Sequence, residues 1–368
     1  MLFRLYGNRN LGLDMLRALA ITMVFVGHGV SLHGLPILGE LGTGVDLFFV
    51  LSGFLIGRIY FLSQRDRTFT LWAFWQARWW RTLPPYFAAL AIYALAMPYY
   101  SHEPIAGYYA LFVQNFVGMV GFNASWSLCV EEHFYLLLPL FGCAIERFGD
   151  RRQLRWMLPV AFLTPLALRL GTLALLDDLP SGWFWMTHFH CEGLIAGVWL
   201  AYVKVEQPEK FVQLRRPALW LTPLIPVLLM ILPMWTSRGP AVNVWVFTLL
   251  AIGYTAWVRV LLDVRWSPER WWGRLALTGV QTLAISSYSI YLVHSLAFAV
   301  VREMIDHWPR GILKTGCILS AALVAAGLFY FLFERTTLML RERYLRREPS
   351  RVDDLVSPRL SPSGITTA

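Results

Sequence analysis

The sequence predicts an all-α polytopic membrane protein with about ten transmembrane helices, one re-entrant or interfacial helix, and both termini in the cytoplasm. Of the 368 residues, 57% are hydrophobic and only 15% are charged. Apolar runs long enough to cross a bilayer recur along the whole chain. Of the 32 Lys and Arg residues, 24 lie in alternate loops and at the two ends of the chain, as cytoplasmic segments require. This distribution reports membrane orientation, so we expect no nucleic-acid partner.

The first expected helix, Leu11–Leu32, carries Asp14, Arg17 and His28 within an apolar run. Arg17 and His28 share one helix face, about 16 Å apart along the axis. Ionisable groups at membrane depth are costly and usually functional. The alternative is that Arg17 extends to the membrane surface and His28 is a hydrogen-bonded packing residue.

The second apolar run, Val45–Leu62, begins beside Asp46 and contains Gly53 and Gly57. Two small residues four apart favour close helix packing. Because the first helix leaves the cytoplasm and the second returns, Asp46 is expected near the depth of His28, where it could orient that imidazole. Alternatively, Asp46 caps the start of its own helix.

A basic, Trp-rich segment with Arg78 and Arg81 precedes Pro84 and Pro85, which are expected to open a third span ending near Tyr100. Two guanidinium groups at the inner membrane surface are suited to bind phosphates. The alternative is a basic belt that rests on anionic lipid headgroups.

The segment 105–121 is apolar but short and contains several glycines and amides. If it crossed the membrane, every later basic loop would lie outside. We therefore expect it to be the re-entrant or interfacial helix. The remaining expected spans are Trp126–Ile145, Trp156–Leu176, Trp185–Val203, Ala218–Trp235, Val242–Leu262, Thr282–Ile305 and Ile312–Phe333. Residues 1–340 are expected to form one membrane domain, and 341–368 a disordered cytoplasmic tail.

Two of these spans carry polar residues on a single face. Ser127, Glu131 and Tyr135 recur every four residues and so lie on one side of a helix that starts near the outer surface. Tyr291 and His294 share a face in the middle of a later span. Glu131 is the candidate acid of this group, at about the expected depth of His28.

The segment THFHCEGLIAG places His188, His190 and Glu192 close together. A His-x-His pair on a helix points its two rings about 200° apart, so we expect no metal site. Gly193 and Gly197 follow and indicate a packing seam.

Together these motifs resemble the membrane-bound acyltransferase family 3, which includes O-antigen, exopolysaccharide, nodulation-factor and macrolide acylases. The resemblance covers roughly residues 10–335. It rests on the following elements, in this order: Arg17 and His28 as an Arg-x10-His motif, GVDLFFVLSGFLIG, the Arg78–Arg81–Pro84 loop, Ser127-Leu-x-x-Glu131-x-x-x-Tyr135, the Gly197 helix, SYSIYLVH and Glu334.

The resemblance implies a multi-pass enzyme of the bacterial inner membrane. Such an enzyme moves an acyl group, here expected to be acetyl, from cytoplasmic acyl-coenzyme A to a hydroxyl of a carbohydrate or glycolipid acceptor. It implies catalytic roles for His28, Arg17, Glu131 and Asp46, and donor binding by Arg78, Arg81 and Arg17. Acceptor contacts are expected from Ser127, Tyr135, Tyr291 and His294.

Two departures from the family pattern matter. Relatives often have a third arginine in the 78–81 loop, where this chain has Gln76 and Trp79. Some relatives carry an esterase-like domain after the last helix, so any such periplasmic partner would here be a separate protein. An acyl-histidine intermediate stays open as an alternative to direct transfer. The rival function is a transporter or flippase that uses the intramembrane Arg, His and Glu as its path.

Overall fold

The computed structural model describes residues 9–30, 40–100, 107–119, 121–236, 244–309 and 311–347, and every regular element in these ranges is a helix. Within these ranges, seven helical stretches are long and apolar enough to cross a membrane. They are Leu11–Gly29, Glu40–Arg65, Asn123–Phe148, Leu154–Leu176, Pro208–Pro233, Trp271–Met304 and Ile312–Arg341. The chain is therefore a multi-pass, all-helical membrane protein, while the count of about ten spans and the cytoplasmic termini remain predictions.

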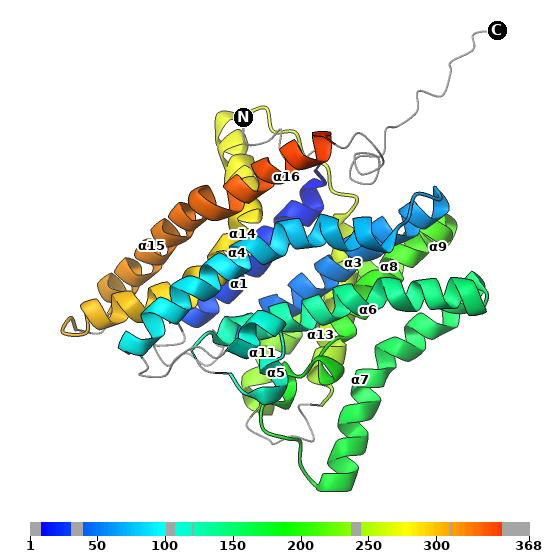
Figure 1. The fold of residues 1–368 in the computed structure, drawn as a ribbon, viewed down its shortest axis with the longest axis horizontal. Helices are drawn as coiled ribbons and strands as arrows, with labels where there is room; N and C mark the ends of the chain where they lie inside the picture. The colour runs from blue at the N-terminus through cyan, green and yellow to red at the C-terminus, as the bar shows by residue number, and fades with distance from the viewer. Residues whose placement is uncertain are drawn as a thin grey trace.

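The main helices run side by side along one direction, and α7 diverges from the rest (Figure 1). Helices α14 and α15 pack together at the opposite edge. The bounds of the helices are α1 (Leu11–Val30), α3 (Gly44–Arg65), α4 (Leu71–Tyr100), α6 (Trp126–Phe148), α7 (Leu154–Leu176), α8 (Glu192–Glu206), α9 (Pro208–Gln213), α10 (Arg215–Leu221), α11 (Leu224–Thr236), α13 (Val246–Leu261), α14 (Trp271–Met304), α15 (Ile312–Phe329) and α16 (Arg335–Arg347).

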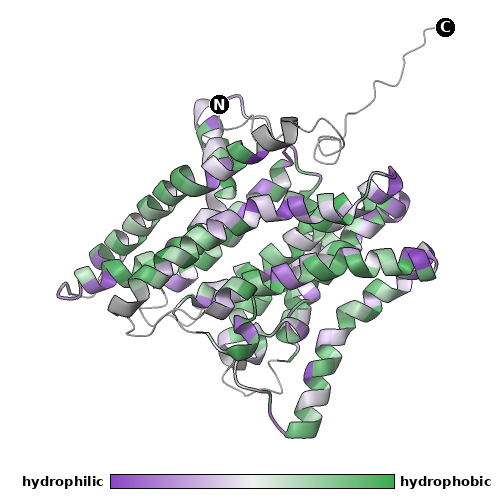
Figure 2. Ribbon diagram, viewed as in Figure 1, coloured by the Kyte–Doolittle hydropathy of each residue, from purple (hydrophilic) through white to green (hydrophobic). Residues whose placement is uncertain are grey.

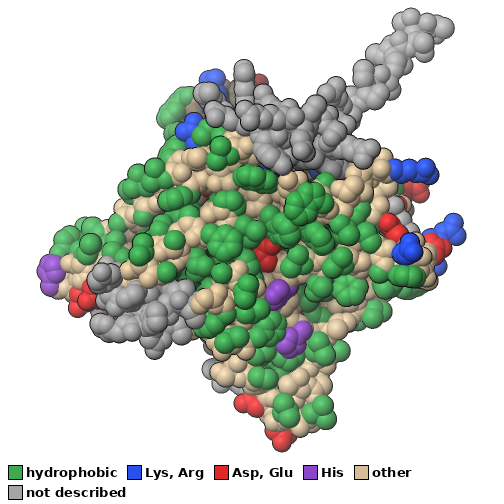
Figure 3. Space-filling view, viewed as in Figure 1, with side chains coloured by type: hydrophobic (Ala, Val, Ile, Leu, Met, Phe, Trp, Pro, Cys, Tyr) green, Lys and Arg blue, Asp and Glu red, His purple; other side chains and the backbone are tan. Residues whose placement is uncertain are grey.

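Hydrophobic residues cover the outside of this bundle as well as its interior. The helices at its edges, α7 and α15, are hydrophobic along most of their length (Figure 2). Lys and Arg side chains gather at the ends of the helices, notably near α9 (Figure 3). A soluble domain would carry charged and polar side chains over most of its surface. Long apolar helices on the outside of the bundle are instead what a lipid environment requires.

The centre of the bundle is a close contact between α3 and α8. A Cβ atom added to Gly53 would lie 1.9 Å from the carbonyl oxygen of Leu194, and one added to Gly197 would lie 2.2 Å from that of Val50. Only glycine allows the two backbones to approach this closely. The packing roles predicted for these glycines are confirmed. Since α3 also carries Asp46, the contact fixes the helix that supports the site.

Helix α4 begins earlier than the sequence suggested. It starts at Leu71 and continues through Pro84 and Pro85 without a break. The prediction that these prolines open the span was therefore wrong. Membrane helices tolerate proline because neighbouring groups satisfy the carbonyls it leaves unpaired. In consequence, Arg78 and Arg81 are held on a helix and not on a loop.

The segment 105–121 contains only short helical pieces in its described part, the 3₁₀ turn Gly107–Leu111 and α5 (Gln114–Val117). Neither piece is long enough to cross a bilayer.

Buried amide side chains hold α5 in place. Gln114 Nε2 donates to the carbonyl of Ser125 at 3.2 Å, and Asn115 Nδ2 donates to that of Trp185 at 2.6 Å.

The last described helix, α16, extends to Arg347. The boundary expected at residue 340 is therefore too early, because helical structure continues into the predicted tail. Helix α16 packs against α4. Residues 348–368 of the predicted tail lie outside the described residues.

Candidate active site

Most of the predicted site residues line one cavity of about 100 Å³. We call it the arginine cavity, after Arg17 from α1 and Arg78 and Arg81 from α4. Glu131 of α6 is the acidic residue of its lining. Three guanidinium groups against one carboxylate make this cavity electropositive, as an anionic ligand requires. Ser127 and Tyr291 complete the predicted set.

Glu131 is held by two hydroxyl groups. Ser52 Oγ donates to Glu131 Oε2 at 3.3 Å, and the hydroxyl of Tyr135 hydrogen-bonds to the same oxygen. The guanidinium of Arg78 lies 4.3 Å from the ring centroid of Tyr135, a cation–π contact. Tyr135 is itself buried, so in this structure it positions Glu131 and Arg78.

The acid next to Glu131 is also buried. Glu132 is only 5% exposed and accepts a hydrogen bond from Thr82 Oγ1 at 3.0 Å. Thr82 lies on α4 beside Arg81. The two adjacent acids of α6 therefore both face α4 and its arginines.

A second, larger cavity of about 750 Å³ contains His28 and Asp46. We call it the histidine cavity. Val45 lines both cavities, so they adjoin. Glu131 had been expected near the depth of His28, but the structure places the two residues in different cavities. On α6 the histidine cavity is lined by Trp126, the first residue of the helix, and Glu131 lies more than one turn further along.

Ser127 and Tyr291 connect the two cavities. The hydroxyl of Tyr291 donates to the carbonyl of Ala124 at 2.9 Å, and Ser127 Oγ lies 2.6 Å from the same hydroxyl. Both residues line the arginine cavity, whereas Ala124 lines the histidine cavity. This hydrogen-bonded pair therefore stands where the cavities meet.

His28 is paired with a second histidine. Its Nδ1 lies 2.8 Å from Nε2 of His294, which is fully buried. His294 Nδ1 lies 2.8 Å from the carbonyl oxygen of Tyr291, which can only accept, so Nδ1 carries the proton. Nε2 of a neutral His294 is then an acceptor, and His28 must donate to it from Nδ1. The geometry leaves Nε2 of His28 as an unprotonated acceptor, and the side chain is exposed to the histidine cavity.

Asp46 does not orient His28 as the sequence suggested. Within the described residues its carboxylate pairs with His190, whose Nε2 lies 2.8 Å from Asp46 Oδ1. Nδ1 of His190 lies 2.7 Å from the carbonyl oxygen of Phe184. Both ring nitrogens of His190 therefore face oxygen atoms, one of the Asp46 carboxyl group and one of the backbone. The depth of Asp46 was predictable, but depth does not specify which neighbouring helix supplies the partner.

The segment that carries His190 is not part of α8, which begins only at Glu192. The fully buried Arg169 of α7 holds it in place. Arg169 donates to the carbonyl of Phe189, to Glu192 Oε1 at 2.6 Å and to the carbonyl of Val244 at 2.9 Å. The role of Arg169 was not predicted, although an arginine in the middle of an expected span is itself a signal in the sequence.

Aromatic rings surround His190 in the histidine cavity. The imidazole stacks on Phe247, with ring centroids 3.6 Å apart, and on Trp126, with centroids 5.2 Å apart. Trp185 and Phe298 also line this cavity. It therefore combines aromatic faces with one ion pair, a lining typical of small-molecule sites.

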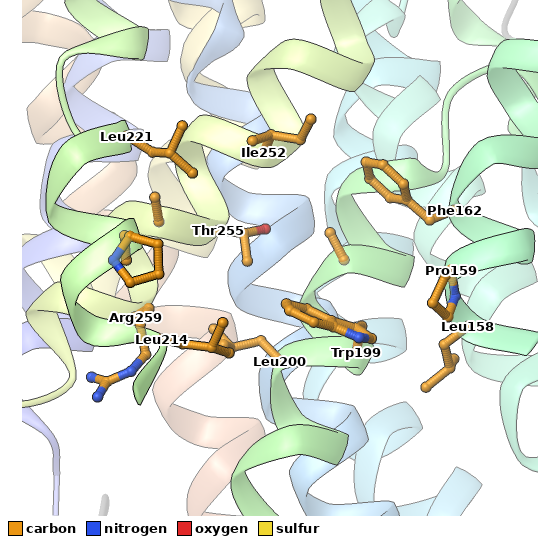
Figure 4. A pocket seen from close by; sticks show the side chains of 14 residues that line it. Leu158, Pro159, Phe162, Trp199, Leu200, Leu214, Leu221, Ile252, Thr255 and Arg259 are labelled. Atoms are coloured by element: carbon orange, nitrogen blue, oxygen red, sulfur yellow. The ribbon is translucent and has the colours of Figure 1, made fainter. Parts of the chain in front are cut away.

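A third hollow, of about 360 Å³, lies between α7, α8, α10 and α13 (Figure 4). Its lining is almost wholly apolar, with Trp199, Phe162 and Leu221 around it. It contains none of the predicted site residues. It lies beside α7, the helix that diverges from the bundle.

The described residues contain no group of three or more His, Cys, Asp or Glu side chains that could hold a metal ion.

Fold and site together define a multi-pass membrane protein with an electropositive cavity beside a cavity that presents an imidazole acceptor. Residues 10–331 match the family described as "Acyltransferase domain", and the chain belongs to that family of acyltransferases. This match confirms the resemblance drawn from the motifs.

The relatives include the peptidoglycan O-acetyltransferase OatA of Listeria monocytogenes, 27% identical over 52% of this chain and 33% of that protein. The O-acetyltransferase OatA of Staphylococcus aureus is 28% identical over 44% of this chain and 30% of its own length. A protein of Komagataeibacter xylinus described as a membrane-bound transacylase, BcsY, is 24% identical over 91% of this chain and 85% of its own. The match to either OatA protein thus covers about a third of its length. No solved structure matches the chain.

Proposed function

We propose that this protein is an O-acyltransferase of the bacterial inner membrane. It transfers an acetyl group from acetyl-coenzyme A on the cytoplasmic side to a hydroxyl of a carbohydrate or glycolipid acceptor on the outer side. Family membership supports acyl transfer over the alternative of a transporter or flippase. Two relatives are named O-acetyltransferases, one of them acting on peptidoglycan, which supports an acetyl donor and a glycan acceptor.

The observation that carries the proposal is the hydrogen bond between His28 and His294. It leaves His28 Nε2 as an acceptor in the larger cavity, where a general base is needed. In the proposed step, Nε2 takes the proton of the acceptor hydroxyl as its oxygen attacks the thioester carbonyl carbon. The carbon–sulfur bond then breaks, and the leaving coenzyme A thiolate takes that proton from His28 Nε2, which restores the neutral imidazole.

The donor side is supported by the arginine cavity. Arg17, Arg78 and Arg81 offer guanidinium groups that can bind the phosphates of coenzyme A. An uncharged acceptor has no anionic group to pair with them. Arg78 and Arg81 lie in the first part of α4, close in the sequence to the basic connection between α3 and α4, which is expected on the cytoplasmic side. Glu131, fixed by Ser52 and Tyr135, offsets part of this positive charge and keeps the guanidiniums in place.

The acceptor side is supported by the histidine cavity. Aromatic rings such as Trp126 and Phe247 offer flat apolar faces to a sugar ring, and the Asp46–His190 pair offers charged hydrogen-bonding groups to its hydroxyls. Between the two sides, the Ser127–Tyr291 pair lies where the acyl group must pass.

The direct test uses purified full-length protein in nanodiscs with acetyl-coenzyme A and a peptidoglycan fragment or other oligosaccharide. Release of free coenzyme A thiol that depends on the protein, together with acetyl ester in the oligosaccharide, is the expected result. Movement of a glycolipid across the bilayer without thiol release would instead support the flippase.

A further inference from the structure

A third polar cavity lies directly against the arginine cavity. It measures about 120 Å³ and is lined by Arg78 and Arg81 of α4 together with Arg341 of α16. We call it the α16 cavity. Arg78 and Arg81 line both cavities, so these two side chains form the wall between them. A ligand held in the α16 cavity would therefore lie next to the proposed donor path.

The lining of the α16 cavity is suited to an anion. Its other residues are apolar or carry a hydroxyl group, as Ser63 and Thr70 do, and none of the described residues in the lining is acidic. Nε of Arg78 is buried without a hydrogen-bond partner among the described residues. A buried guanidinium donor left unsatisfied is costly, and a phosphate oxygen would remove that cost.

Arg341 comes from outside the family domain. The family match ends at residue 331, whereas Arg341 lies on α16, which packs against α4. Arg78 and Arg81 lie one turn apart on α4, with Gln76 and Trp79 close to them in the sequence. Helix α16 brings a guanidinium to these two from a distant part of the chain.

We propose that Arg341 is a third donor-binding arginine, which contacts a phosphate of the acyl-coenzyme A together with Arg78 and Arg81. The proposal rests on the proposed function, because it takes its ligand from that reaction. It makes α16 part of the binding site and not merely a tail. The same chemistry could recognise the phosphate of an anionic lipid headgroup, and the experiment separates the two sources.

The test measures the affinity of full-length protein for coenzyme A and for pantetheine, which lacks the nucleotide phosphates, in phosphatidylcholine nanodiscs. Loss of one charge-assisted contact should weaken coenzyme A binding about tenfold to a hundredfold in Arg341→Ala. Pantetheine binding should stay unchanged. Arg341→Gln, which keeps the first three side-chain carbons and an N–H donor but not the charge, should show a smaller loss, and it provides a second variant should the alanine protein fold poorly.

Arg335→Ala is the matched control, because it removes the same charge from the same helix but lines none of these cavities. It should bind coenzyme A as the wild type does. If Arg341→Ala and Arg341→Gln keep wild-type affinity for coenzyme A, the inference is wrong. If the two Arg341 variants bind coenzyme A normally but are no longer stabilised against heat by added phosphatidylglycerol, the α16 cavity binds a lipid headgroup. That result too would contradict the inference. A wild-type protein that binds no coenzyme A would overturn the proposed function itself, which distinguishes the two failures.

Discussion

His28 and His294, which are far apart in the sequence, form a hydrogen bond of 2.8 Å between Nδ1 of the first and Nε2 of the second. Their rings lie nearly parallel, with 11° between their planes. His294 donates its Nδ1 proton to the backbone carbonyl of Tyr291, so its Nε2 is the acceptor toward His28. The hydrogen bond between the two histidines therefore fixes the tautomer of His28. His294 was expected to bind substrate, but it lines neither cavity and acts on His28 instead.

His294→Leu removes the acceptor that fixes this tautomer. We expect kcat to fall roughly tenfold, the value of about one hydrogen bond, with little change in the KM for acetyl-coenzyme A. His294→Gln offers an amide oxygen to His28 Nδ1 and should recover part of the loss. Steady-state kinetics with a pH profile checks the prediction. Equal activity in the leucine and wild-type proteins would show that His294 only packs.

Arg78→Ala combined with Arg81→Ala should mainly raise the KM for acetyl-coenzyme A, since the change removes two guanidiniums from the proposed phosphate site. Arg65→Ala, an exposed arginine that pairs with Asp66 at the end of α3, is the control and should have no such effect. Donor titration of the purified variants provides the measurement. A double variant with normal donor affinity but poor membrane association would favour the lipid-belt alternative.

Asp46→Asn removes the carboxylate that pairs with His190 Nε2. We expect a higher KM for the oligosaccharide acceptor, several-fold in size. Hydrolysis of acetyl-coenzyme A without acceptor should change little, because Asp46 does not contact His28. Asp66→Asn, on the surface, serves as the control. If Asp46→Asn instead slows hydrolysis and transfer equally, Asp46 acts on the base after all.

The membrane class, the packing roles of Gly53 and Gly197 and the grouping of Arg17 with Arg78 and Arg81 could be predicted from the sequence, because periodicity and depth are local properties. The place of Glu131 among these arginines was not predicted. The partners could not. The depth of Asp46 suggested His28, whereas the packing of α3 against α8 brings His190 to it. Likewise nothing local relates Arg341 to Arg78, since only the return of α16 onto α4 brings them together.

Topology provides a further prediction. A cysteine introduced at Ser181, between α7 and α8, should react with a membrane-impermeant reagent from outside. One at Gln207, between α8 and α9, should react only after permeabilisation. Labelling of intact cells checks both positions. The reverse pattern would mean that the segment 105–121 crosses the membrane.

The central claim is that His28 Nε2 is the base. A positioned general base contributes typically about 10²–10⁴-fold, so His28→Ala should lower turnover by that order while the protein stays folded. Activity of the wild type should also fall as the pH drops through the titration of the imidazole, because a protonated His28 cannot accept a proton. The most direct measurement is the specific activity of His28→Ala per folded molecule, with folding scored by thermal unfolding in nanodiscs. The account predicts a loss of about 10²-fold or more at unchanged stability. Near-wild-type turnover per folded molecule would contradict it.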